Sequence, residues 1–186
     1  MRLHPNTSQK EYAKSLLTEA TFRDKHTDGN RGQRAIGFLA EKMIHDLFNV
    51  EMIPSQGFDC GIDIVLNDIK IDIKTMGRDV DMKDYYVNNL FASQVESDKY
   101  LNDIYLFASY NKTKGYLDLL GWIKKAEVKA LVKGIKRFEQ GQLRERSNGS
   151  SFRIKSDNYE IPCRSLEPFV SPTVFMMEIG KFKPLI

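Results

Sequence analysis

The sequence predicts an α/β fold in which helices flank a mixed central β-sheet. Apolar residues recur with the helical period in the first third of the chain. Short runs of β-branched and aromatic residues follow, bounded by turn residues as strands are. The expected order is two helices, two strands, a helix, two strands and a helix, then irregular chain, which suits a sheet covered by helices. With 186 residues, the chain is long enough for one domain with a real core.

Two helices are expected before the first strand. Residues 11–22 read EYAKSLLTEATF, and the preceding Ser8 forms a capping-box pattern with Glu11. A second helix is expected over about residues 33–48, with Glu41 at the edge of its apolar face. The side chains expected to face the core are Tyr12, Leu16, Leu17, Ala20, Ile36, Leu39, Ala40, Met43 and Leu47.

The stretch GFDCGIDIVLNDIKIDIK, residues 57–74, predicts a β-hairpin. Two β-branched runs flank Asn67-Asp68, which we place at the centre of a tight turn. This register puts Asp63 directly opposite Asp72, where two like charges on paired strands are destabilising. The arrangement depends on the register, because a slip of one residue would turn Asp72 to the other face of the sheet.

The second strand of this hairpin alternates between the two faces of the sheet. Its isoleucines form the core face, and the opposite face carries Lys70, Asp72 and Lys74. A divalent cation would relieve the repulsion between Asp63 and Asp72, since Mg²⁺ binds one or two carboxylates together with water and phosphate. The alternative is a solvent-facing strand on which Asp72 pairs with Lys70 or Lys74. The hairpin pattern favours neither of the two.

Later elements are expected from shorter patterns. They are a helix over 85–99, strands over 103–110 and 116–123, a short basic helix over 124–136, and extended pieces over 159–162 and 174–179. Residues 79–84, DVDMKD, lack the Gly and Glu that an EF-hand loop requires, so a solvated acidic loop is expected there.

The ordered set of acidic residues resembles the PD-(D/E)XK nuclease superfamily, which has the restriction-endonuclease-like fold. In that pattern an acidic residue lies on an early helix, an Asp lies at the start of one strand, and D/E-x-K lies on the next strand. The matching positions here are Glu41 in GFLAEKMIHDLF, Asp63 in FDCGIDIVL, and Asp72 with Lys74 in IDIK.

The resemblance covers about residues 31–125 in the order of its elements. It implies a single nuclease-like domain over 1–186, with a basic C-terminal extension over about 126–186. Two positions depart from the pattern: Ile62 stands where the superfamily has Pro, and Asp72 stands where Glu is commoner.

The resemblance also implies a role for each residue. Asp63 and Asp72 bind Mg²⁺ or Mn²⁺ together with the backbone carbonyl of Ile73, and Glu41 is a further ligand, directly or through water. Lys74 orients or activates the attacking water and stabilises charge on the scissile phosphate. The implied activity is metal-dependent hydrolysis of DNA phosphodiester bonds, with DNA as the partner and a homodimer left open. No phosphate-binding glycine motif is present, so no nucleotide cofactor is expected.

Positive charge is concentrated late in the chain. Residues 121–186 have a formal net charge of +6, against −3 for residues 1–120. Within 124–155 there are 10 basic and 3 acidic residues, which suits contact with a nucleic-acid backbone, although a solvated surface is the alternative. The expected DNA contacts are Arg31, Arg34, Lys124, Lys125, Arg144 and Arg146.

Two non-catalytic functions remain open from the sequence. One is a DNA-binding or assembly protein with a nuclease-like fold, and the other is an accessory protein whose acidic face is a protein interface. No apolar run spans a bilayer and no secretory signal is visible, so neither membrane association nor export is expected. Cys60 and Cys163 are expected as free thiols in an intracellular, cytoplasmic protein. His45, four residues after Glu41, is expected to be a surface or packing residue rather than a metal ligand.

Overall fold

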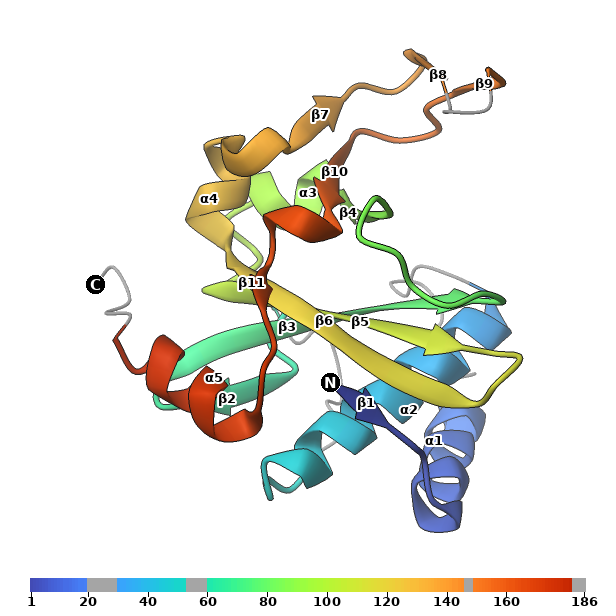
Figure 1. Cartoon of the computed structure of the whole chain (residues 1–186), viewed down its shortest axis with the longest axis vertical. Helices are drawn as coiled ribbons and strands as arrows, with labels where there is room; N and C mark the ends of the chain where they lie inside the picture. The colour runs from blue at the N-terminus through green and yellow to red at the C-terminus, as the bar shows by residue number, and fades with distance from the viewer. Residues whose placement is uncertain (20–29, 53–59, 146–148, 182–186) are drawn as a thin grey trace.

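The computed structural model describes residues 1–19, 30–52, 60–145 and 149–181. These residues form a mixed sheet with helices packed against it (Figure 1), so the predicted α/β class is confirmed. The strand order of the main sheet is β1-β6-β5-β3-β2, and β11 also pairs with β6. Its strands are β1 (Arg2–Leu3), β2 (Ile64–Leu66), β3 (Ile69–Arg78), β5 (Ile104–Asn111), β6 (Tyr116–Lys124) and β11 (Glu167–Pro168). β3 and β5 are parallel, and the other pairs are antiparallel.

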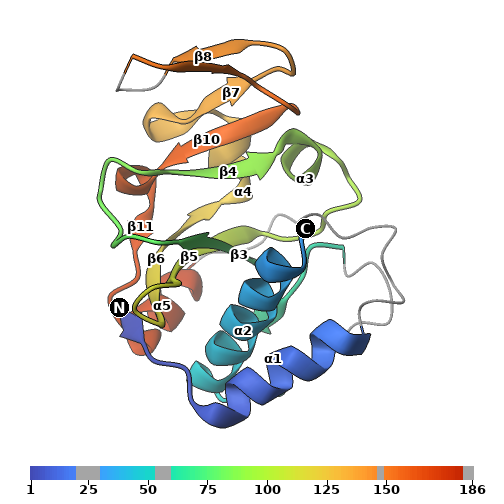
Figure 2. The ribbon, with the colours of Figure 1, turned by 90° about the vertical axis from the view of Figure 1, so that its right-hand side faces the viewer.

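Helices cover one face of the main sheet. They are α1 (Thr7–Glu19), α2 (Arg31–Leu47) and α5 (Pro172–Ile179). Helix α2 packs on β3 and β5, and α1 packs on α2 (Figure 2). The core on this face joins the isoleucines of β3 to Met43 and Ile44 of α2 and to Phe175 of α5. The isoleucine face predicted for β3 is therefore buried as expected.

The first helix begins earlier than the sequence pattern indicates. Asn6 precedes it and exchanges two hydrogen bonds of 2.9 Å with Gln9, so this pair forms the cap instead of Ser8 and Glu11. The second helix is capped in the same way by Asn30 and Gln33.

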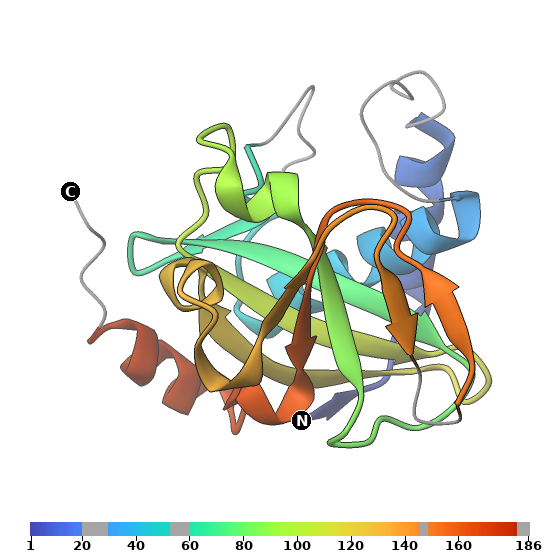
Figure 3. The same cartoon turned by 90° about the horizontal axis from the view of Figure 1, so that it is seen from above.

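A second layer covers the opposite face of the main sheet. It contains a small sheet of strands β4 (Val87–Phe91), β10 (Asn158–Pro162) and β7 (Lys136–Phe138). Its other elements are α3 (Ala92–Glu96), α4 (Lys125–Lys129), η2 (Val132–Gly134), β8 (Leu143–Glu145), β9 (Ser151–Arg153) and η3 (Cys163–Ser165). Figure 3 shows this layer lying across the long strands. A second core forms between the two layers, where Tyr105 and Phe107 of β5 are packed with Leu90 and Ile161.

The helix predicted over residues 85–99 is wrong. Residues Val87–Phe91 form strand β4, and only Ala92–Glu96 are helical. The strand is selected by its partner β10, which pairs with it from Asn158 to Pro162, and this distant pairing overrides the local pattern.

Two predictions in the last third are also corrected. The expected helix over 124–136 stops at Lys129, and Leu131 and Lys133 then adopt positive φ values of 54° and 55°. The piece expected as extended over 174–179 belongs to helix α5. Ser171 caps that helix by accepting from the Val174 N–H, and Pro172 occupies its first turn.

Residues 167–169 are packed into the body of the molecule. Pro168 pairs with Gly121 of β6, and a Cβ at Gly121 would lie 2.3 Å from the Glu167 carbonyl oxygen, so only glycine allows this close approach. Phe169 belongs to the same core as α2. Both cysteines are free, as predicted. In the described part of the chain, no helix combines the length and apolar character needed to cross a membrane.

Candidate functional site

The paired residues of β2 and β3 have the predicted register, and the expected pair of Asp63 with Asp72 lies beyond the ladder. Ile64 pairs with Ile71, and the ladder closes at Leu66 and Ile69. Asn67 and Asp68 have φ values of 50° and 63°, as both central residues of a type I′ turn do. Asn and Asp tolerate this left-handed conformation better than other side chains do, which explains why the turn forms without glycine.

Asp63 lies directly before β2 and is bonded to β3 in two ways. Its backbone N–H donates to the carbonyl oxygen of Ile71 at 2.9 Å, and its carboxylate Oδ2 accepts from the N–H of Ile73 at 2.6 Å. Ile71 and Ile73 present their amides along the same edge of β3. The Asp63 side chain therefore takes the place of a backbone carbonyl at the next rung, and its carboxylate is held against the strand.

The charge of Asp63 is coupled to the other predicted catalytic residues. The Asp63 residue is partly exposed, but burial of its carboxyl among protein atoms raises its pKa well above the usual value. The negative charges of Glu41 and Asp72 raise the pKa of Asp63 further. The charge of Lys74 and the hydrogen bond from the Ile73 N–H lower it. Glu41, Asp72 and Lys74 are therefore close enough to Asp63 for their charges to act on its carboxyl.

Asp72 and Lys74 form an ion pair on the face of the sheet opposite the isoleucines. Lys74 Nζ lies 2.8 Å from Asp72 Oδ1, and Asp72 is only 1% exposed. Tyr105 is the partner of Asp72 across β5, and burial together with the charge of Asp72 raises the pKa of its hydroxyl. Lys70 is exposed. The pairing of Asp72 with Lys74, which the sequence offered as an alternative to a metal site, is thus present.

Two residues of α2 reach the hairpin. Glu41 is half-buried and its charge acts on Asp63. His45 follows one helical turn later, is 4% exposed, and has its Nε2 2.9 Å from the carbonyl oxygen of Asp63. The expectation that His45 is a surface or packing residue missed this contact. The spacing of four residues from Glu41 was the available signal, because it places both side chains on one helix face.

The surroundings of Asp72 include a glycine turn and a second lysine. Gly61 has a φ of 70°, and a Cβ there would lie 2.8 Å from Cδ1 of Tyr100 and 3.5 Å from Asp72 Oδ2. Lys125 donates from Nζ to the Tyr100 carbonyl at 2.5 Å. Burial lowers the pKa of Lys125, and the charge of Asp72 opposes this change. Lys125 was predicted as a DNA contact, and it lies close enough to Asp72 for the charge of Asp72 to raise its pKa.

The donor set suits a hard cation in its chemistry. Carboxylates and a backbone carbonyl are the ligands that Mg²⁺ and Mn²⁺ prefer, and a cation would relieve the crowding of negative charge on Asp63. Within the described ranges, however, no group of three or more His, Cys, Asp or Glu side chains is arranged to hold a metal ion. The described side chains therefore match a hard cation in the type of their donor atoms, and not in a gathered ligand set.

The predicted DNA contacts are spread over several elements. Arg31 is exposed and Arg34 half-buried in the first turn of α2, and Lys124 ends β6. The guanidinium of Arg144 donates hydrogen bonds of 2.9 to 3.1 Å to the Glu160 carboxylate. The positive charge of Arg144 is therefore compensated within the protein. Arg146 lies outside the described residues.

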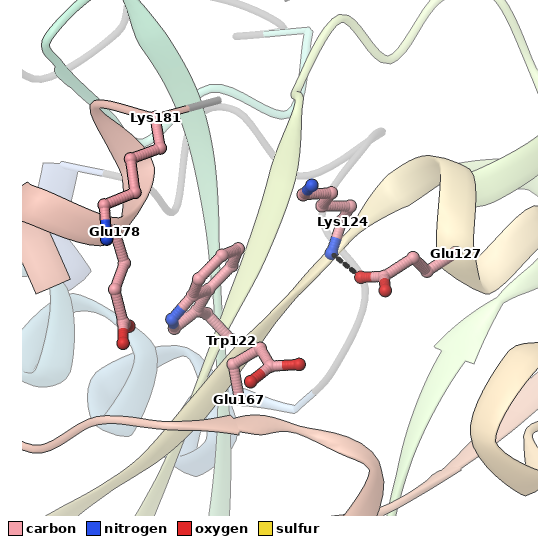
Figure 4. A pocket seen from close by; sticks show the side chains of 6 residues that line it. All are labelled: Trp122, Lys124, Glu127, Glu167, Glu178 and Lys181. Atoms are coloured by element: carbon pink, nitrogen blue, oxygen red, sulfur yellow. Dashed lines mark hydrogen bonds between the residues drawn. The ribbon is translucent and has the colours of Figure 1, made fainter. Parts of the chain in front are cut away.

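A surface hollow lies apart from the carboxylate cluster. It has a volume of about 260 Å³, and its lining residues, drawn in Figure 4, are Trp122, Lys124, Glu127, Glu167, Glu178 and Lys181. None of the four predicted catalytic residues lines it. Lys133 bridges Glu167 and Glu127, which compensates two of the carboxylates in the lining.

Comparison of the chain with protein-family models, with curated proteins and with solved structures found no match. Function is therefore inferred from the site itself.

Proposed function

We propose that the protein is a metal-dependent deoxyribonuclease that hydrolyses DNA phosphodiester bonds through Glu41, Asp63, Asp72 and Lys74. The observation that carries this proposal is the placement of Asp63, Asp72 and Lys74 on one hairpin: the Ile73 N–H donates to the Asp63 carboxylate at 2.6 Å, and Lys74 Nζ lies 2.8 Å from Asp72 Oδ1. The negative charges of Glu41 and Asp72, which raise the pKa of Asp63, support it. Phosphodiester hydrolysis needs an activated water and stabilisation of negative charge on the phosphate, and an acidic cluster that holds a metal beside an ammonium can supply both.

Each residue has a task in this proposal. Asp63 and Asp72, with the Ile73 carbonyl, would hold Mg²⁺ or Mn²⁺, which when bound supplies a water of lowered pKa and neutralises charge on the phosphate. Asp72 orients Lys74 through the 2.8 Å ion pair, so that the ammonium is available to the scissile phosphate. Glu41 adds negative charge from α2 and accepts hydrogen bonds from water at the site. Asp63 is fixed for its task by the Ile73 N–H.

A cleavage assay with matched variants tests the proposal. Duplex, single-stranded and branched DNA are incubated with Mg²⁺, Mn²⁺ or EDTA, using wild type, Asp72→Asn and Lys74→Ala. We expect metal-dependent cleavage by wild type and losses of about 10²–10³-fold in both variants. Lys70→Ala is the control, because Lys70 is an exposed lysine on the same strand and the same face, two residues before Asp72. Absence of metal-dependent cleavage of every substrate by wild type would refute the proposal.

A second candidate is a DNA-binding or assembly protein without catalysis. The Asp72–Lys74 ion pair and the bond from Ile73 to Asp63 complete the hairpin with protein groups alone, which favours this candidate. The same experiment separates the two functions. DNA binding by wild type and by Lys74→Ala, with no cleavage by either, would support the second candidate.

A further inference from the structure

His45 is bonded to the backbone of a predicted catalytic residue. Its Nε2 lies 2.9 Å from the carbonyl oxygen of Asp63, and the side chain is buried on α2. A carbonyl oxygen only accepts hydrogen bonds, so Nε2 must carry the proton and donate. This contact fixes the tautomer of the ring, because the bond made by one nitrogen determines where the proton resides.

The bonds around Asp63 come from two elements. From β3, Ile71 accepts from the Asp63 N–H and Ile73 donates to its carboxylate. From α2, His45 donates to its carbonyl. Asp63 precedes the paired residues of β2, so the bond from its N–H to Ile71 is its backbone contact with β3. The His45 bond connects the backbone of Asp63 to the helix that also carries Glu41.

Packing alone does not account for an imidazole at this position. The other ring nitrogen, Nδ1, is buried and has no hydrogen-bond partner in the part of the chain that the structure describes. A buried polar atom without a partner costs stability, so an aliphatic side chain would fill the same space better. Within the described part of the chain, the hydrogen bond to the Asp63 carbonyl is what the imidazole of His45 provides that an aliphatic side chain would not.

We propose that His45 is a positioning residue that fixes the backbone of Asp63 from α2 and thereby aligns the Asp63 carboxylate with Glu41 and Asp72 for metal binding, an inference that rests on the proposed function. His45 acts through Asp63 and touches neither metal nor substrate. The packing of Met43 and Ile44 on the isoleucines of β3 sets the separation between α2 and the hairpin. The His45 bond adds a directional contact between the two elements that carry Glu41 and Asp63.

Three variants at one position test this role. His45→Gln places an amide N–H near the position of Nε2, whereas His45→Asn carries the same amide one methylene shorter and cannot reach the carbonyl. His45→Leu removes the polar group and retains the bulk. Thermal melts confirm folding of each variant. Two further readouts are the Mn²⁺ dissociation constant, measured by electron paramagnetic resonance, and hydrogen exchange at the Ile73 amide, with the Ile71 amide of the same strand as the internal reference.

We expect His45→Gln to bind Mn²⁺ within about threefold of wild type, and His45→Asn and His45→Leu to bind at least about tenfold more weakly. Exchange at Ile73 should accelerate relative to Ile71 in the Asn and Leu variants alone. Equal behaviour of the Gln and Asn variants in both readouts would overturn the positioning role. If wild type does not bind Mn²⁺, the proposed function fails. The Ile73 exchange data, which need no metal, then decide the positioning role by themselves.

Discussion

At the scale of single residues, opposing influences act on the carboxyl of Asp63. Burial raises its pKa, and so do the charges of Glu41 and Asp72, whereas Lys74 and the Ile73 N–H lower it. The raising causes win, so the folded protein binds this proton more tightly than the unfolded chain does. Stability is therefore lost as the pH rises from the ordinary value of 3.8 through the higher folded pKa. Ionised Asp63 is a cost to the folded state in the absence of a cation.

This balance predicts that Asp63→Asn stabilises the metal-free protein. The amide oxygen of Asn can still accept from the Ile73 N–H, while the repulsion from Glu41 and Asp72 is removed. In EDTA, the thermal midpoint of the variant should exceed that of wild type, by more at pH 8 than at pH 5. Asp68→Asn in the exposed turn of the same hairpin is the control and should show no such growth with pH. An equal difference in thermal midpoint between Asp63→Asn and wild type at pH 5 and pH 8 would contradict the electrostatic explanation.

Single residues also show how far the sequence could predict this site. Asn67 and Asp68 are consecutive residues that tolerate positive φ, so the turn, and with it the register that brings Asp63 toward Asp72, could be predicted locally. The spacing of His45 from Glu41 places both on one helix face, but the contact of His45 with Asp63 could not be predicted, because nothing local shows that this face meets the carbonyl of Asp63. The 2.6 Å bond from Ile73 was likewise hidden, since a ladder pattern does not show where a side chain replaces a backbone acceptor.

At the scale of elements, Asp81 ties the loop after β3 to the turn between β5 and β6. Its carboxylate accepts from Asn111 at 2.8 Å and from Lys114 at 2.6 Å, and it is also bonded to the Tyr116 hydroxyl. The bonds from Lys114 and Tyr116 lower its pKa to about 2. This loop was expected to be a solvated acidic segment, and the structure shows that Asp81 joins it to the hairpin instead.

The Asp81 network predicts a pH-dependent contribution to stability. Because its folded pKa is lowered, the stabilisation is present above the ordinary value of 3.8 and is lost as the pH falls through about 2. Asp81→Asn should lower the thermal midpoint at pH 7 by a few degrees, and the difference from wild type should shrink between about pH 4 and pH 2. Asp79→Asn is the matched control in the same loop, since the Asp79 side chain is 72% exposed and pairs with Lys112 alone in the described contacts. Equal effects of the two substitutions would contradict a specific role for Asp81.

Strand β4 marks the limit of local prediction for elements. Residues 85–99 contain side chains that suit a helix, yet Val87–Phe91 pair with β10 from the far end of the chain. The long strands β5 and β6 were predicted nearly to their ends, because both have strong β-branched and aromatic patterns and a short turn between them. The strands differ in how far along the sequence their partners lie. Strand β5 pairs with the next strand, β6, whereas the partner of β4 is β10, far along the chain.

At the scale of the whole molecule, the C-terminal residues complete the core that the N-terminal helices begin. Phe175 of α5 is 1% exposed and contacts the rings of Phe48, Phe169 and Trp122, with centroid distances of 5.6, 5.2 and 6.0 Å. Segments that are more than 100 residues apart therefore share one hydrophobic cluster. The sequence could predict a basic late segment from its charge but could not predict this return, which depends on packing between distant residues.

This shared core predicts cooperative unfolding and a large cost for Phe175→Ala. Removing a buried aromatic ring leaves a cavity, so we expect a loss of about 3–5 kcal/mol in the free energy of unfolding. Met177→Ala on the same helix is the control, because Met177 is 62% exposed and its substitution should cost less than about 0.5 kcal/mol. Denaturant unfolding is followed by the fluorescence of Trp122, the single tryptophan of the chain, and by far-ultraviolet circular dichroism. Coincident midpoints are expected, because α5 and the main sheet unfold together. A fluorescence transition that precedes the loss of secondary structure would instead identify the C-terminal residues as a separable appendage.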